Sequence, residues 1–196
     1  MIVKIVNMAR RIRRMLYAPP LSSNAEIRLH LGCGNDYWPG YVNIDIDPNS
    51  ACDVQMDIMR IGENYPANSV TEISLIHSLS YLRLWQARDL FATLYQILKP
   101  GGFVVIEFPD VSKCARKALE SKEARTEYME AVRGLYAFDM EQIARKEMFI
   151  PYAFGWSGWH LEQELKEAGF RKIAISDPTT HGQRLWRDTR VEAFKE

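Results

Sequence analysis

Short apolar runs alternate with helical patterns along most of the chain. The clearest helical period covers Trp85–Leu98, where leucines recur every four residues on one face. Phe103–Ile106 is entirely apolar, which is typical of a strand buried on both faces. Helices that alternate with strands favour an α/β fold around a mostly parallel sheet. The other predicted strands are Ile27–Leu31, Tyr41–Ile46, Val54–Ile58, Val70–Ile76, Arg171–Ser176 and Val191–Lys195, and the last two can pair as a terminal hairpin.

Two further segments are predicted to be helical. The stretch from Val111 to about Arg133 is rich in charged residues and has no wide apolar stripe, so it is expected to be a surface helix or a cover. Ser157 is a candidate N-cap for a helix over Gly158–Ala168, which Gly169 ends.

The first twenty residues differ in charge from the rest of the chain. Met1–Pro20 contains five basic and no acidic residues, and its apolar residues follow a helical period until Pro19. We expect a basic N-terminal helix over residues 1–20 followed by one domain over residues 25–196. The helix can dock through its apolar face, form a lid, touch an anionic membrane surface weakly, or contact nucleic acid.

The composition excludes several function classes. Hydrophobic residues make up 47% of the 196 residues and charged residues 26%, which is typical of a globular domain. Lys+Arg and Asp+Glu both number 25, so the overall charge gives no strong signal for nucleic acid. Cys33, Cys52 and Cys114 are odd in number and lack metal-ligand spacing, and no apolar run reaches membrane-spanning length. We therefore expect a cytoplasmic protein with reduced thiols, no metal site and no transmembrane segment.

The sequence from Ile27 to Asp47 holds the main candidate chemistry. A predicted strand runs into Gly32-Cys33-Gly34, and the next strand ends near Asp45. Glycines at a strand end let a ligand approach the backbone, and a carboxylate at the tip of the next strand can accept hydrogen bonds from ribose hydroxyls. The pattern predicts a site for a nucleoside-containing cofactor at the carboxyl edge of the sheet.

The order of these motifs resembles class I S-adenosylmethionine-dependent methyltransferases of the methyltransferase type 11-like group. The resemblance implies a Rossmann-like three-layer sandwich whose seven-stranded, mostly parallel sheet ends in an antiparallel strand. It also implies S-adenosylmethionine as the cofactor. The motifs that carry it are LHLGCG with VNIDID, the pair Asp57-Ile58, NSVTEISLIHSLSYL, LYQILKPGGFVVIEFPD and GWSGWHLEQELKEAGF.

The resemblance also implies which residues form the site. Asp45 corresponds to the ribose-binding acid, Asp57 to the contact with the adenine amino group, and Ile58 to a contact with the adenine ring. His77 ends a strand, where it is either a structural histidine or a base that takes a proton from a hydroxyl nucleophile. The predicted cofactor-binding residues are Gly32, Cys33, Gly34, Asn35, Asp45, Ile46, Asp57, Ile58 and His77, and the predicted catalytic residue is His77.

Several positions depart from the family pattern. His30 replaces the acid that usually opens the first motif, Asp36 replaces its third glycine, and Ser80-Tyr81 replaces a common Glu-His pair. Only Asn35–Gly40 separates the first two predicted strands, which is too short for a crossover helix. Either the helix is reduced to a loop or the second strand is misplaced.

These observations favour a methyltransferase that modifies an oxygen or nitrogen of a small molecule or saccharide. The alternative is a catalytically inactive methyltransferase-fold binding module or partner subunit, because of the departures described above. The acceptor region is expected at the strand ends and in Val111–Trp159. The weaker candidates for a role there are Tyr81, Glu107, Asp110, Tyr152 and His160.

Overall fold

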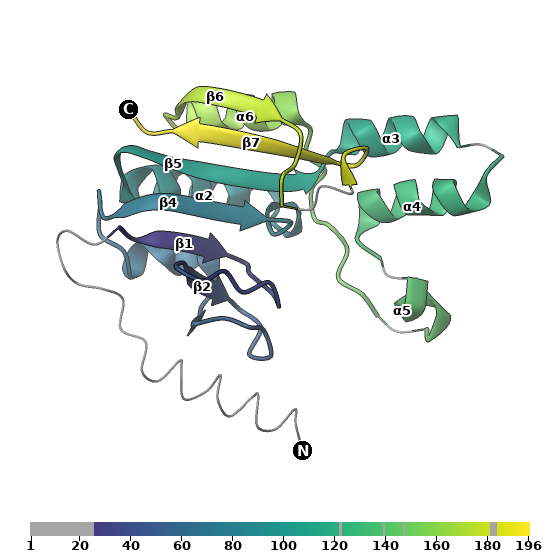
Figure 1. Ribbon diagram of the computed structural model, residues 1–196, viewed down its shortest axis with the longest axis horizontal. Coiled ribbons are helices and arrows are strands. Elements are labelled where there is room, and N and C mark those ends of the chain that lie inside the picture. The colour runs from purple at the N-terminus through teal and green to yellow at the C-terminus, as the bar shows by residue number, and fades with distance from the viewer. Residues whose placement is uncertain (1–25, 122, 139, 147, 181–183) are drawn as a thin grey trace, which may run out of the picture.

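A seven-stranded sheet with the order β3-β2-β1-β4-β5-β7-β6 forms the centre of the molecule (Figure 1). This computed structural model describes residues 26–196 except 122, 139, 147 and 181–183, so the helix predicted for residues 1–20 lies outside the described residues. β7 is antiparallel to β5 and β6, whereas the other pairs are parallel, so the predicted Rossmann-like α/β fold with an antiparallel last strand is confirmed. The strands are β1 (Arg28–Leu31), β2 (Val42–Asp45), β3 (Val54–Gln55), β4 (Val70–Ile76), β5 (Leu98–Pro109), β6 (Arg171–Ser176) and β7 (Asp188–Phe194).

The apolar core lies between the sheet and the helices α2 (Leu84–Ile97) and α6 (Gly158–Glu167). Both helices lie behind the sheet in the view of Figure 1. Leu90 and Leu94 of α2 are buried with Ile106 of β5, as the helical period predicts. β5 begins earlier than the predicted Phe103, because Lys99-Pro100-Gly101-Gly102 belongs to its first part, where the pairing with β4 shifts register.

Three helices stand beyond the carboxyl ends of β4 and β5 (Figure 1). The helical stretch predicted from residue 111 is divided into α3 (Val111–Glu120) and α4 (Arg125–Tyr136), and α5 (Met140–Ala144) follows. α3 leads away from the sheet and α4 returns beside it, so the last turn of α4 lies near the sheet edge (Figure 1).

The connection from β1 to β2 is a loop, which settles the choice that the sequence left open. Asn43 stabilises this loop, because its Oδ1 accepts from the Trp38 backbone N–H at 2.9 Å and its Nδ2 donates to the Trp38 carbonyl at 3.0 Å. Asp53 in turn accepts from the Asn43 backbone N–H at 3.0 Å. Trp38 stacks on the buried ring of His30, with 4.3 Å between ring centroids. Side-chain bonds to a buried asparagine thus hold the loop in place of a helix.

The end of β3 and the start of the next segment differ from the prediction for a local reason. β3 ends at Gln55, before the predicted Ile58, because the Asp57 carboxylate accepts from the Met59 N–H at 2.9 Å and begins the short helix η1 (Ile58–Glu63). A second short helix, η2 (Leu79–Tyr81), follows β4.

Ser157 occupies the N-cap position of α6, but its side chain makes no capping hydrogen bond. Asp110 Oδ2 accepts from the Gly158 N–H at 2.9 Å and supplies the cap instead. The other oxygen of Asp110 accepts from the Ser112 N–H at 2.8 Å, at the start of α3. One carboxylate therefore caps two helices.

Within the described part of the chain, no helix has the length and apolarity to cross a bilayer.

Candidate functional site

Gly32 and Gly34 turn the chain at the end of β1, and both have a positive φ, of 68° and 53°. A Cβ added at Gly32 would lie 2.4 Å from the Ser78 Cβ, whereas a Cβ added at Gly34 would have no atom within 4 Å. Gly32 is therefore needed for the packing of the turn against the residue that follows His77. Gly34 borders open space, which leaves its backbone accessible to a ligand.

Asp45 meets this turn at the end of β2. Its Oδ2 accepts from the Gly34 N–H at 2.7 Å, and its Oδ1 accepts from the Asp47 N–H at 2.8 Å. Because each carboxylate oxygen has two acceptor positions, each retains one beyond these bonds. The glycine turn and the acid that the sequence paired are thus in direct contact.

The neighbouring predicted residues differ in exposure. Ile46 is 64% exposed immediately after β2, so an apolar side chain lies at the surface beside Asp45. Asn35 is also exposed, directly after Gly34. Cys33 is buried, and burial raises the pKa of its thiol to about 12, so it stays protonated at neutral pH.

Asp57 and Ile58 lie in the next loop of the same edge. The Met56 N–H donates to the Asp45 carbonyl at 2.9 Å, which joins the two loops. Asp57 is exposed, and its Oδ1 is engaged in the cap of η1. Ile58 is half-buried and packs against the apolar core.

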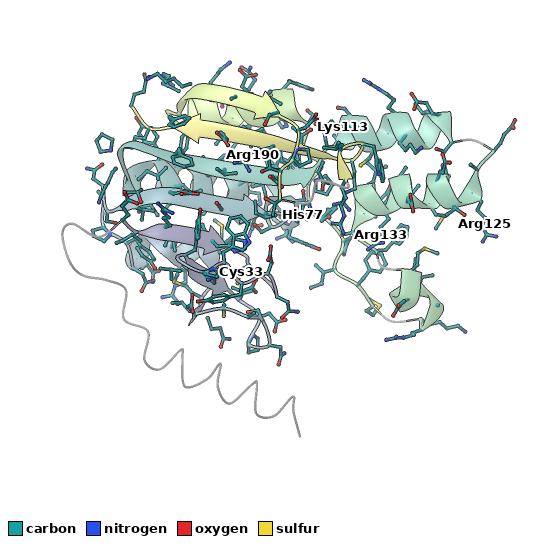
Figure 2. All side chains as sticks on the ribbon, in the orientation of Figure 1. Cys33, His77, Lys113, Arg125, Arg133 and Arg190 are labelled. Carbon is teal, nitrogen blue, oxygen red and sulfur yellow. The ribbon has the colours of Figure 1, made fainter. Side chains whose placement is uncertain are left out.

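His77 directly follows β4 in a left-handed backbone conformation, with φ of 57°, and its N–H donates to the Glu107 carbonyl at 2.8 Å. It directly precedes Ser78, the residue that packs against Gly32. Figure 2 labels His77 and Cys33 at the same edge of the sheet. The structure thus brings His77 to the glycine turn, as expected for strands that end at one edge.

The imidazole of His77 pairs with Asp188, which begins β7. The His77 Nε2 lies 2.9 Å from Asp188 Oδ2, and Asp188 is fully buried. Arg187 donates to both oxygens of the same carboxylate, at 2.6 and 2.9 Å. Burial opposes ionisation of Asp188, but the hydrogen bonds from His77 and Arg187 outweigh it and lower the pKa of the carboxyl below its usual value.

An ionised Asp188 determines the protonation pattern of the ring. A carboxylate can only accept, so Nε2 carries the proton of this hydrogen bond, and in the neutral ring Nδ1 is the basic nitrogen. Sequence reasoning missed both Asp188 and Arg187. The signal was available in the antiparallel last strand, because its first residue must lie where the parallel strands end.

The weaker sequence candidates have mainly structural contacts. The Glu107 carboxylate is buried and accepts from Arg190 Nη1 at 2.9 Å and from the Thr179 N–H at 3.0 Å. Asp110 caps two helices. His160 lies on α6, where its Nε2 is 3.3 Å from Glu164 Oε1.

Tyr81 and Tyr152 pack edge to face, with 5.1 Å between ring centroids. Burial raises the pKa of Tyr152 to about 12, so its phenol stays protonated at neutral pH.

Over residues 26–196, outside the gaps named above, no group of three or more His, Cys, Asp or Glu side chains could hold a metal ion.

No protein-family model and no curated protein sequence matches this chain. Solved structures do match. A SAM-dependent methyltransferase from Archaeoglobus fulgidus has a TM-score of 0.57 at 14% identity, over 98% of this chain and 94% of that one. A putative S-adenosylmethionine-dependent methyltransferase from Listeria monocytogenes has a TM-score of 0.57 at 13% identity, over 96% and 99%.

A third match is phosphoethanolamine N-methyltransferase 2 from Haemonchus contortus, whose structure holds S-adenosyl-L-methionine. Its TM-score is 0.52 at 14% identity, over 97% of this chain and 52% of that one. The topology and these neighbours agree, so the chain has the fold of class I S-adenosylmethionine-dependent methyltransferases.

Proposed function

We propose that the protein is an S-adenosylmethionine-dependent methyltransferase that moves a methyl group to an oxygen or nitrogen of a small molecule or saccharide. The observation that carries the proposal is the contact between Gly34 and the Asp45 carboxylate, beside open space at the carboxyl edge of the sheet. The methyltransferase fold of the structural neighbours supports it. Three buried cysteines with free thiols support a cytoplasmic location.

The residues at this edge fit the cofactor. The two remaining acceptor positions of Asp45 suit the paired hydroxyls of a ribose, and exposed Ile46 offers an apolar contact beside it. The open space at Gly34 lets a ligand approach the backbone. We assign the adenine end to Asp57 and Ile58 and the methionine end to Asn35.

S-adenosylmethionine supplies an electrophilic methyl group on a positively charged sulfur. The chain contributes by holding the acceptor in line with that methyl group, which can account for much of a rate enhancement. For a hydroxyl acceptor, we assign proton removal to Nδ1 of His77. Asp188 then stabilises the imidazolium through Nε2, as a buried carboxylate does for a histidine base.

Calorimetry with S-adenosylmethionine and S-adenosylhomocysteine tests the cofactor assignment. Asp45→Ala is expected to weaken binding by about 1–3 kcal/mol, because charge-assisted hydrogen bonds are lost. Asp47→Ala is the matched control: its exposed side chain accepts from the Asn49 N–H, and its backbone bond to Asp45 survives the substitution. Unchanged affinity in Asp45→Ala contradicts the ribose assignment.

Activity distinguishes the enzyme from an inactive binding module of the same fold. With labelled S-adenosylmethionine and a small-molecule extract as the source of acceptors, the wild type is expected to produce labelled product. His77→Ala is expected to lower this rate far more than it lowers S-adenosylhomocysteine affinity, since the base acts on the acceptor. Equal rates in both proteins remove His77 from the mechanism, and binding without any transfer favours the module.

A further inference from the structure

A pair of tyrosines lies beside the segment that follows the proposed base. Tyr81 ends η2, and its N–H donates to the carbonyl of Ser78 at 3.2 Å, one residue after His77. Tyr152 comes from the distant segment between α5 and α6, and its ring packs edge to face on Tyr81 with 5.1 Å between centroids. The fold therefore brings two aromatic rings to a short helical turn that starts directly after His77, at the carboxyl edge of the sheet.

Backbone hydrogen bonds hold the two tyrosines in this arrangement. The N–H groups of Ala153 and Phe154 donate to the Ser80 carbonyl, at 2.8 and 3.2 Å. These bonds join the residues that directly follow Tyr152 to the residue that directly precedes Tyr81. The pair is thus set by the backbone and needs no ligand to form, which reduces the entropy that a ligand loses by ordering its site.

The two rings are accessible, and their hydroxyls are available to a ligand. Tyr81 is 45% exposed, and Tyr152 is half-buried. Neither hydroxyl has a hydrogen-bond partner within the part of the chain that the structure describes. Tyr152 has no fully buried polar atom without a partner there, so its hydroxyl reaches solvent. Burial raises the pKa of both phenols, so each hydroxyl can donate as well as accept at neutral pH.

Apolar ring faces with hydroxyls at their tips match a ligand of the same mixed character. A pyranose presents C–H groups on one face of its ring, which pack on an aromatic face, and carries hydroxyls around its rim. We propose that Tyr81 and Tyr152 bind the sugar ring of a saccharide acceptor, with one of its hydroxyls facing His77. This inference rests on the proposed function and narrows its acceptor to a saccharide.

The inclination of the two rings favours a sugar over a flat aromatic molecule. Their planes meet at 65°, so they form two sides of a corner rather than one continuous surface. A puckered ring with substituents in several directions can contact both sides of this corner, whereas a flat arene can stack on only one. Tyrosine also suits such a site because its rigid, amphipathic side chain loses little conformational entropy on binding.

Saturation-transfer NMR on the full chain tests the inference. The probes are the methyl pyranosides of glucose, galactose and mannose, with phenol as the aromatic comparison, each titrated with and without S-adenosylhomocysteine. The site variants are Tyr81→Ala and Tyr152→Ala. Tyr128→Ala is the matched control, because Tyr128 is 46% exposed on α4 and lies three residues from Arg125, which Figure 2 shows at the far end of that helix.

At least one pyranoside is expected to bind the wild type and to receive saturation mainly at its ring C–H groups. Both alanine variants should weaken this binding at least about tenfold, since a ring contact and a hydrogen bond are lost, whereas the control keeps the wild-type affinity. Tyr81→Phe and Tyr152→Phe keep the ring packing, so they test the hydroxyls even where an alanine variant does not fold. Each should weaken binding about threefold.

Failure of this inference can be distinguished from failure of the proposed function. In a chain that binds S-adenosylhomocysteine, the inference alone is overturned if no pyranoside binds or if phenol binds more tightly than every pyranoside. It is equally overturned if the control weakens binding as much as the site variants, or if both phenylalanine variants keep the wild-type affinity. Pyranoside binding that depends on Tyr81 and Tyr152, in a chain that does not bind S-adenosylhomocysteine, overturns the cofactor assignment and leaves the sugar site in place.

Discussion

Alanine at Gly32 and alanine at Gly34 are expected to change different properties of the glycine turn. Both residues have a positive φ, but an added Cβ meets the Ser78 Cβ at 2.4 Å only in the case of Gly32. Gly32→Ala should therefore reduce mainly the stability of the fold, and Gly34→Ala mainly the affinity for the cofactor.

The expected magnitudes follow from these two contributions. A left-handed conformation costs a non-glycine residue roughly 1–2 kcal/mol, and this applies to both variants. Contacting carbons normally stand about 3.5–4.0 Å apart, so Gly32→Ala adds a severe overlap. Ser78 cannot move away easily, because its hydroxyl donates to the Leu31 carbonyl at 3.0 Å. With an overpacking term of about 1–3 kcal/mol, Gly32→Ala should lose about 2–5 kcal/mol in total.

Urea unfolding measures the stability difference, and calorimetry with S-adenosylhomocysteine measures binding. Gly34→Ala should unfold about 1–2 kcal/mol more easily than wild type and bind the ligand at least about tenfold more weakly, because its Cβ occupies the space at the turn. A double-mutant cycle separates the two terms. In the Ser78→Gly background the overlap is absent, so Gly32→Ala should cost only the roughly 1–2 kcal/mol of the left-handed conformation.

Two results would refute this reasoning. Equal losses of unfolding free energy in the two alanine variants would show that the turn does not pack against Ser78 as described. Wild-type affinity for S-adenosylhomocysteine in Gly34→Ala would show that no ligand approaches the backbone at Gly34, and the cofactor assignment would lose its main support.

Three further predictions concern single side chains. Glu164→Gln removes the ion pair with Arg88. It should lose only about 1 kcal/mol of unfolding free energy at pH 7, because Arg88 is half-exposed and solvent weakens the pair. Arg88 lowers the pKa of Glu164, so the stabilisation from this ion pair is complete above about pH 5 and is lost as the pH falls through the folded-state pKa. In urea unfolding, the difference in unfolding free energy between wild type and Glu164→Gln should therefore be smaller at acidic pH than at pH 7. Asp110→Ala should lose about 2–4 kcal/mol in the same assay, since two helices lose their cap. A thiol reagent at neutral pH should modify Cys33 far more slowly in the folded chain than in urea, and rapid modification of folded protein would contradict its burial.

Local patterns were sufficient where both ends of an element carry clear signals. β4 spans Val70–Ile76 as predicted, and α2 is displaced by one residue from the predicted Trp85–Leu98. The contact between the glycine turn and Asp45 could also be anticipated, because parallel strands that are neighbours end at the same edge.

Distant partners explain what the sequence could not decide. The loop between β1 and β2 depends on Asn43 and on Asp53, ten residues later, and no local period reports such a bond. The cap of α6 comes from Asp110, although Ser157 holds the position that a cap residue normally occupies. Side-chain hydrogen bonds across a fold leave no periodic trace, so they appear only once the elements are assembled.

The reversed direction of β7 has a consequence for how the proposed sites are divided. The proposed cofactor residues come from the loops after β1, β2 and β3, whereas the proposed base His77 follows β4 and pairs with Asp188 at the start of β7. The two groups meet where Ser78 packs against Gly32, directly beside His77. Substitutions in separate groups without shared partners should add in free energy. Asp45→Ala should therefore weaken S-adenosylhomocysteine binding by the same factor in the wild type and in the His77→Ala background; strong coupling between the two substitutions would mean that the two groups share a contact.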